Sequence, residues 1–252
     1  MPTRQPDRAP LDLPALQFEP SEELRDILAA LHEQVSGLLA ALPPIDPAFA
    51  QRLVELQQFE TAMERMGLVA HPILLELHKA RPDIVDVDRL ATDTWEELRG
   101  KLARIAAQFG DARAAAVFED MIAAHEARLY ELVPIAAASL MERILGLVRR
   151  DGTPKKRDEW LESVVGRLSP WQLGGLPGIR VYQILLKHTF VQCWADSTAD
   201  SMPYMNRHAL AHGRGTKRAT VRDSLNSLLL AHFVFWLSIV VRDEPESPAL
   251  DS

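Results

Sequence analysis

The chain has 252 residues, a formal net charge of −7 and a single cysteine. The acidic total argues against a surface covered with nucleic-acid-binding groups, although a local basic patch can still attract phosphate. One cysteine excludes an internal disulfide and favours a reducing compartment, so we expect a cytoplasmic protein. Alanine and leucine dominate while glycine and aromatic residues are sparse, which predicts an all-α fold.

The N-terminal part of the chain indicates a tail followed by helices. Residues 1–20 are rich in proline and lack an apolar core segment, which predicts a flexible tail and no signal peptide. Apolar residues recur at three- and four-residue steps over 21–42, which is typical of an amphipathic helix. A second helix is expected from Asp46-Pro47 to Gly67, forming a hairpin with the first.

Further helices are expected along the middle of the chain. The sequence predicts a short helix over 71–79 and a longer one over 86–109. The longest periodic run covers 111–149, where Pro134 should kink the helix or split it in two. His125 lies on the apolar stripe of this run, so we expect it in the core.

The C-terminal part contains the most apolar helix. A glycine-containing loop is expected over 172–178, followed by an apolar helix over 179–194 and a final helix over 220–242. The stretch 228–241 is nearly unbroken in its apolar character but contains His232, and it is shorter than the roughly 20 residues that a membrane span needs. It therefore predicts the buried central helix of a bundle, with no membrane association.

These elements predict an all-α protein built from helical bundles. Four parts are expected along the chain. They are a flexible tail (1–20), an N-terminal helical region (21–110), a helical bundle (111–243) and a disordered tail (244–252).

The densest group of chemically able side chains is N-R-H-A-L-A-H-G at 206–213, on a short helix expected over 202–212. Two imidazoles and a guanidinium lie within it. A basic stretch follows, with no Asp or Glu between Asp200 and Asp223; its cations include Arg214, Lys217, Arg218 and Arg222. Histidine can supply or accept a proton near neutral pH, and arginine can bind two phosphate oxygens at once. The segment therefore favours chemistry on a phosphate.

The spacing of Arg207 and His212, with His208 after the arginine, resembles the R-x(4–6)-H signature of the HEPN family. Many members of that family are metal-independent endoribonucleases. The resemblance runs from within 111–149 to Arg242 and does not cover the N-terminal helices. It implies a HEPN-like bundle that cleaves RNA as a homodimer, without a cofactor or metal. It also implies a toxin or anti-phage effector restrained by an antitoxin or another regulatory protein.

The resemblance also suggests roles for the residues of the motif. His212 would be the principal acid or base, Arg207 would hold the scissile phosphate, and His208 and Asn206 would orient the phosphate or His212. The cations Arg214, Lys217, Arg218 and Arg222 would bind flanking phosphates. Positions 207 and 212 point roughly 140° apart on an ideal helix. Either the arginine wraps round, the helix unwinds before Gly213, or two copies combine.

Two alternatives remain from the sequence. In the first, the bundle is a non-catalytic interaction module that binds a partner protein or nucleotide, and both histidines are structural helix-end residues. The four-residue spacing of His208 and His212 also suits zinc, but no third ligand stands out and Ala209 replaces the glutamate of zinc proteases.

Overall fold

The computed structural model describes residues 46–148, 165–166, 168–169, 172–185, 189, 206, 210 and 218–243. The chain divides into two compact units, residues 1–50 and 51–252, and the core described below belongs to the second. The predicted tails and the amphipathic helix expected over 21–42 lie outside the described residues.

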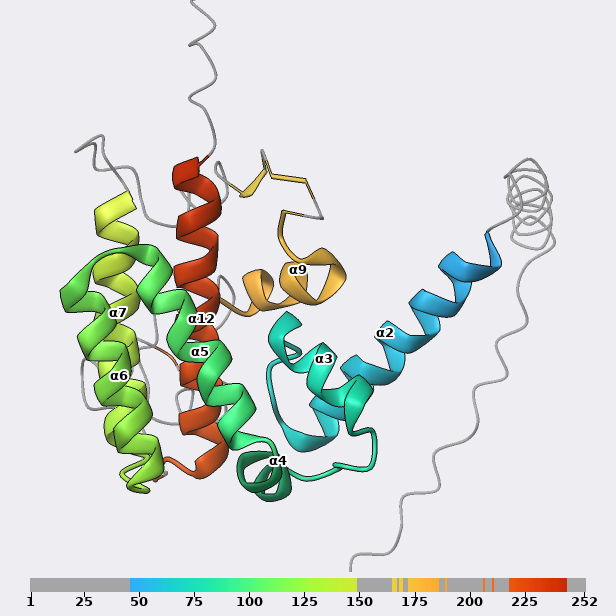
Figure 1. Cartoon of the computed structure of the whole chain (residues 1–252), viewed down its shortest axis with the longest axis horizontal. Coiled ribbons are helices and arrows are strands. Elements are labelled where there is room, and N and C mark those ends of the chain that lie inside the picture. The colour runs from blue at the N-terminus through green and yellow to red at the C-terminus, as the bar shows by residue number, and fades with distance from the viewer. Residues whose placement is uncertain are drawn as a thin grey trace, which may run out of the picture. The chain divides into compact units, whose positions relative to one another are not determined.

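Every regular element in the described ranges is a helix, which confirms the predicted all-α class (Figure 1). The helices, in chain order, are α2 (Pro47–Met66), α3 (Pro72–Ala80), α4 (Val87–Asp93), α5 (Trp95–Phe109), α6 (Ala112–Glu126), α7 (Leu132–Val148), α9 (Gly175–Ile184) and α12 (Val221–Asp243).

Helix α12 is the element around which the others pack. It contacts α4, α5, α6, α7 and α9, and it lies among them in Figure 1. Its apolar side chains are buried on several sides of the helix, as Leu225, Leu230 and Phe235 illustrate. By length and composition α12 also satisfies the requirements for a membrane span, but 78% of that window is buried inside the structure. Burial of this extent is typical of a helix in the core of a bundle.

One hydrophobic core runs through α5, α6, α7 and α12, so it continues across the expected boundary between residues 110 and 111. Polar contacts join the same elements. Asp111 accepts a hydrogen bond from Ala114 N at 2.7 Å and pairs with Arg143 at 3.0 Å, linking α6 to α7. Arg242 Nη1 donates to the carbonyl oxygen of Phe109 at 2.9 Å, linking α12 to the end of α5.

The breaks between helices differ in detail from those expected. The helix predicted over 86–109 is two helices, because the backbone turns at Thr94, whose hydroxyl donates to Leu90 O at 2.7 Å. The run 111–149 divides before Pro134, which lies in the first turn of α7, where proline is tolerated. There Arg128 adopts φ 59°, while Leu129 N donates to Ala124 O and Arg128 N to His125 O, a Schellman ending for α6.

The loop expected over 172–178 is wrong in its second half, because α9 already begins at Gly175. Gly174 and Gly175 take positive φ values of 78° and 73°, and Pro177 fits the first helical turn. A Cβ at Gly174 would lie 3.1 Å from Pro72 and 3.2 Å from Trp236. The start of α9 therefore sits against the start of α3 and against α12.

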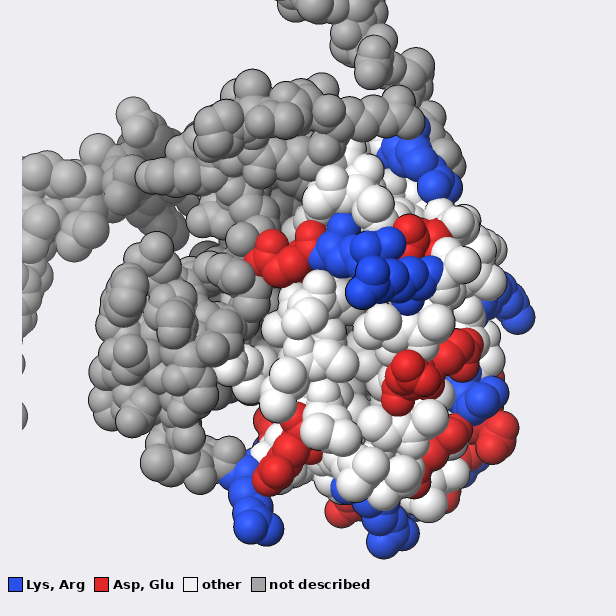
Figure 2. Space-filling view, turned by 90° about the vertical axis from the view of Figure 1, so that its left-hand side faces the viewer, with Lys and Arg blue, Asp and Glu red and all other residues white. Residues whose placement is uncertain are grey.

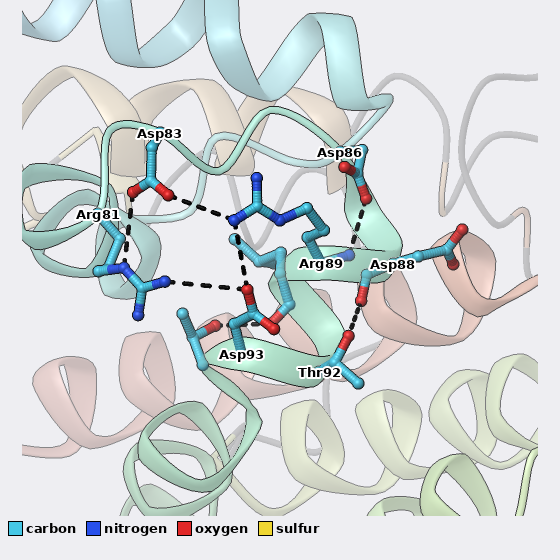
Figure 3. Close-up of polar contacts among 9 residues, drawn as sticks. Arg81, Asp83, Asp86, Asp88, Arg89, Thr92 and Asp93 are labelled. Atoms are coloured by element: carbon cyan, nitrogen blue, oxygen red, sulfur yellow. Dashed lines mark hydrogen bonds and ion pairs between the residues drawn. The ribbon is translucent and has the colours of Figure 1, made fainter.

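An exposed ion-pair network holds the connection between α3 and α4 (Figure 3). Arg81 lies 3.5 Å from Asp83 and 3.8 Å from Asp93, and Arg89 lies 3.3 Å and 3.6 Å from the same two carboxylates. Two cations and two anions compensate one another here. The network therefore fixes a turn and leaves no surplus charge for a ligand.

Candidate functional site

Most of the predicted motif lies outside the described residues. This applies to Arg207, His208 and His212, and to the downstream cations Arg214 and Lys217. Asn206 is described and is only 4% exposed, and its carbonyl oxygen accepts a hydrogen bond from Leu210 N at 3.1 Å. That bond joins residues four apart, and the remaining residues of the helix predicted over 202–212 lie outside the described ranges.

The two described cations of the basic stretch, Arg218 and Arg222, flank the start of α12, and both are exposed. Arg218 lies 3.9 Å from Glu131, but its side chain is 94% exposed, so this pair is weak and leaves the guanidinium accessible. Arg222 packs one side of its guanidinium over the turn at Gly67, where a Cβ would come within 2.8 Å of Arg222 Cδ and 2.9 Å of its Nε, while the residue as a whole stays exposed. Both guanidinium groups are therefore available to an anion.

Thr220 and Asp223 explain why α12 begins at this point. Thr220 N and its hydroxyl donate to Asp223 Oδ2 at 2.8 and 2.7 Å, and Asp223 N donates back to Thr220 Oγ1 at 3.4 Å. This reciprocal capping box satisfies backbone groups that a helix start otherwise leaves free. It fixes the end of the helix that carries Arg222, beside the positive end of the helix dipole.

A histidine–serine pair lies beneath this helix end. His125 Nδ1 is 2.7 Å from Ser224 Oγ, and the imidazole stacks on Trp95 with ring centroids 4.6 Å apart. Burial lowers the pKa of His125 to about 4, an effect that the charge of Glu126 partly opposes. Nucleophile and base lie at this distance in hydrolases. Ser224 is fully buried, however, so no substrate can reach it and the pair is part of the core.

A second polar cluster joins α12 to the turn before α3. Asn226 accepts a hydrogen bond from Val69 N at 2.8 Å and donates to Gly67 O at 2.9 Å. Further along α12, His232 Nδ1 lies 3.3 Å from His71 Nε2, and the two rings meet edge to face. Burial lowers the pKa of His71 well below its usual range, helped by the nearby His232, and lowers the pKa of His232 to about 3.

The sequence interpretation missed the partners of these polar residues. Asn226, His232 and Ser224 stand out as polar positions in an apolar helix, which is a signal of buried hydrogen bonding. Their partners lie 99 to 161 residues away in the chain, and nothing local identifies them.

The distribution of surface charge and of possible metal ligands limits the kinds of binding site that the described part of the chain can form. On the face shown in Figure 2, basic and acidic side chains lie interspersed among uncharged ones, so that face offers no broad basic surface. Within the described ranges, no group of three His, Cys, Asp or Glu side chains is placed to hold a metal ion. The zinc alternative rests on His208 and His212, which lie outside those ranges.

A shallow groove opens between α2 and the connection after α3. Its volume is about 510 Å³, and its lining combines apolar Val54, Ala62, Pro82 and Val85 with polar Gln57, Gln58, Thr61, Arg65 and His78. Val85 is 69% exposed, so its side chain is accessible at the surface.

The fold defines the protein only as an all-α helical assembly. No family model, curated protein or solved structure matches the chain.

Proposed function

We propose that this protein is a metal-independent endoribonuclease of the HEPN type. The observation that carries the proposal is that the N-R-H-x-x-x-H-G segment is followed, later in the same basic stretch of sequence, by a capped helix start with two accessible arginines. The motif supplies the acid, base and phosphate-binding groups, and Arg218 and Arg222 supply further positive charge on the same stretch of chain.

The reaction needs only the RNA and these side chains. The 2′-hydroxyl attacks the adjacent phosphorus while a base removes its proton. The bond to the 5′-oxygen breaks as an acid protonates that oxygen, leaving a 2′,3′-cyclic phosphate and a free 5′-hydroxyl. His212 acts as acid or base, Arg207 neutralises charge at the phosphorane, and His208 supports either group. The burial of Asn206 suits a residue that orients the motif from within the fold.

Two motifs from a homodimer would supply the acid and the base together, and would concentrate positive charge on an otherwise acidic chain. A nuclease of this kind requires restraint in the cytoplasm, so a toxin or anti-phage role with an antitoxin or other regulatory protein follows from the same proposal.

The test is incubation of the purified protein with total RNA in excess EDTA, beside an Arg207→Ala/His212→Ala double variant. Discrete cleavage by the wild type alone is the expected result. The exposed Arg52 on α2 supplies a matched control, since Arg52→Ala should cleave normally. Cleavage that persists in the double variant, or that requires a divalent metal, contradicts the proposal.

The groove between α2 and the connection after α3 favours a second candidate, a non-catalytic interaction module. In that case neither the wild type nor the double variant cleaves RNA. Binding of a co-purifying protein is then lost in Val85→Asp and kept in the double variant.

A further inference from the structure

The hydrogen bonds around His71 and His232 fix the proton positions of both rings. His71 Nδ1 caps α3 by accepting a hydrogen bond from Ile73 N at 3.0 Å, so this nitrogen carries no proton. A neutral His71 must therefore carry its proton on Nε2, the atom that lies 3.3 Å from His232 Nδ1. His71 thus donates and His232 accepts, which places the proton of His232 on Nε2.

Neither ring can gain a proton without losing a hydrogen bond. A proton on His71 Nδ1 removes the cap of α3, because that nitrogen can no longer accept from Ile73 N. A proton on His232 Nδ1 would point at the N–H of His71, so that two donors face each other and the hydrogen bond between the rings is lost. The arrangement is compatible only with two neutral imidazoles.

In the described part of the chain, no neighbouring charge compensates a proton at this site. Helix α5 packs against both α3 and α12, and the start of α9 lies against Pro72 and Trp236. Among the titratable and charged groups of these helices, His232 alone affects the pKa of His71, and no charged side chain affects that of His232. His71 is also 2% exposed, so water does not solvate the charge.

The same turn is held by a second contact that does not respond to pH. The amide of Asn226 binds Gly67 O and Val69 N, six residues before His232 on α12. About nine ångströms of helix separate the two contacts, from a rise of roughly 1.5 Å per residue. The start of α9 depends on the His71–His232 contact. Gly174 packs between Trp236 and Pro72, and Pro72 is the residue that follows His71.

We propose that the His71–His232 pair is a proton-sensitive latch between α3 and α12. Protonation of either ring releases the start of α3 from α12 and removes the support of α9, while Asn226 keeps residues 67–69 attached. The opening is local, and the bundle of α5, α6, α7 and α12 stays folded. This inference does not rest on the proposed nuclease activity.

Imidazole ¹⁵N spectra of the full chain test the proton positions, with signals assigned from His71→Asn and His232→Gln. At pH 7 both rings should be neutral and protonated on Nε2. An Nδ1–H form of either ring, or a charged ring at pH 6, overturns the proposal.

Hydrogen exchange followed by mass spectrometry tests the opening. After correction for intrinsic rates, protection of 72–80 and 175–184 should fall about tenfold per pH unit below pH 6 for each proton taken up. Peptides from α7 should change much less. Equal loss in all peptides, or constant protection of α3 and α9 down to pH 4.5, overturns the latch.

A matched variant separates the latch from other acid effects. In His71→Asn/His232→Gln, asparagine still caps α3 and neither side chain titrates, so protection of α3 and α9 should become independent of pH. If the double variant does not fold, His232→Gln alone keeps an acceptor for His71 and should lower the pH dependence by one proton. An unchanged pH dependence in both contradicts the proposal.

Discussion

His125 on α6 and Ser224 on α12 form a hydrogen bond of 2.7 Å inside the core, beneath the stacked ring of Trp95. Because both side chains are buried, loss of either leaves the other without its partner. We expect Ser224→Ala and His125→Phe each to lower the free energy of unfolding by about 1–3 kcal/mol. Urea unfolding of the single and double variants measures this, and the two effects should not add, since they remove one bond. Full additivity would show that the bond contributes nothing.

Lowering the pH should begin to destabilise the protein at pH values well above those at which carboxylates titrate. A buried histidine with a lowered pKa takes up its proton more readily when the chain unfolds. Its contribution to stability is therefore complete above the ordinary value of 6.5 and is lost as pH falls below it, until the folded pKa is reached. That limit is about 4 for His125 and about 3 for His232.

Each such histidine should lower the free energy of unfolding by about 1.4 kcal/mol per pH unit within its window. Urea unfolding at pH 7.5 and 5.5 measures the loss, and His125→Gln should reduce it. Asp111 affects stability at lower pH. The hydrogen bond from Ala114 N lowers the pKa of this carboxyl, so its contribution to the free energy of unfolding is lost as the pH falls below the usual pKa of 3.8. Equal stability at the two pH values would disprove the role of the histidines.

Asn226 should be among the least replaceable polar residues of α12. Asn226→Ala removes the partners of Val69 N and Gly67 O and should cost about 2–4 kcal/mol, because buried backbone groups are left unsatisfied. Asn226→Asp keeps the acceptor, but it loses the donor and buries a charge. Thermal unfolding of both, beside the exposed control Ser139→Ala, checks this. A midpoint close to the wild type in Asn226→Ala would contradict the bidentate contact.

Arg128 offers a stabilising substitution. It occupies the left-handed position that ends α6, with φ 59°, where a side chain is strained by about 1 kcal/mol. Arg128→Gly should therefore raise the thermal midpoint, although the added freedom of the unfolded chain reduces the gain. The converse is Gly110→Ala, at φ 81° with open space around its Cβ, which should lower the midpoint through backbone strain alone. A lower midpoint in Arg128→Gly would refute the argument.

The RNA-binding proposal predicts a salt effect at the start of α12. If Arg218 and Arg222 contact phosphates, alanine at either should weaken RNA binding without regard to sequence. Each variant should also reduce the slope of log affinity against log salt by about 1. Fluorescence anisotropy with single-stranded RNA measures this, with Arg52→Ala as the control. Unchanged slopes would exclude both arginines from the interface.

The sequence predicted the helices well where apolar periodicity and end signals agree, as in α2, which ends at Met66 just before Gly67, and in α12. The sequence-based prediction failed where the boundary of a helix depends on the tertiary or side-chain contact of a single residue. Thr94 turns the chain through a bond from its own hydroxyl to Leu90 O, and Gly174, the residue before α9, packs against Pro72 and Trp236. Neither contact is indicated by a pattern of neighbouring residues in the sequence.

The candidate site divides in the same way. The N-R-H-x-x-x-H-G segment is visible because its groups are adjacent in sequence. The pairs His71–His232 and His125–Ser224 are not, because 161 and 99 residues separate their members. Only the packing of α12 brings them together.

The position of α12 in the chain has a consequence for synthesis on the ribosome. Helices α5, α6 and α7 emerge first, but the apolar faces that they pack against α12, as Phe109 and Phe118 do against Phe235, have no cover until α12 is translated. The nascent chain must therefore hold these surfaces exposed while the intervening residues are made. Folding of this core is completed only after α12 leaves the exit tunnel, and until then the chain is a natural client for chaperones.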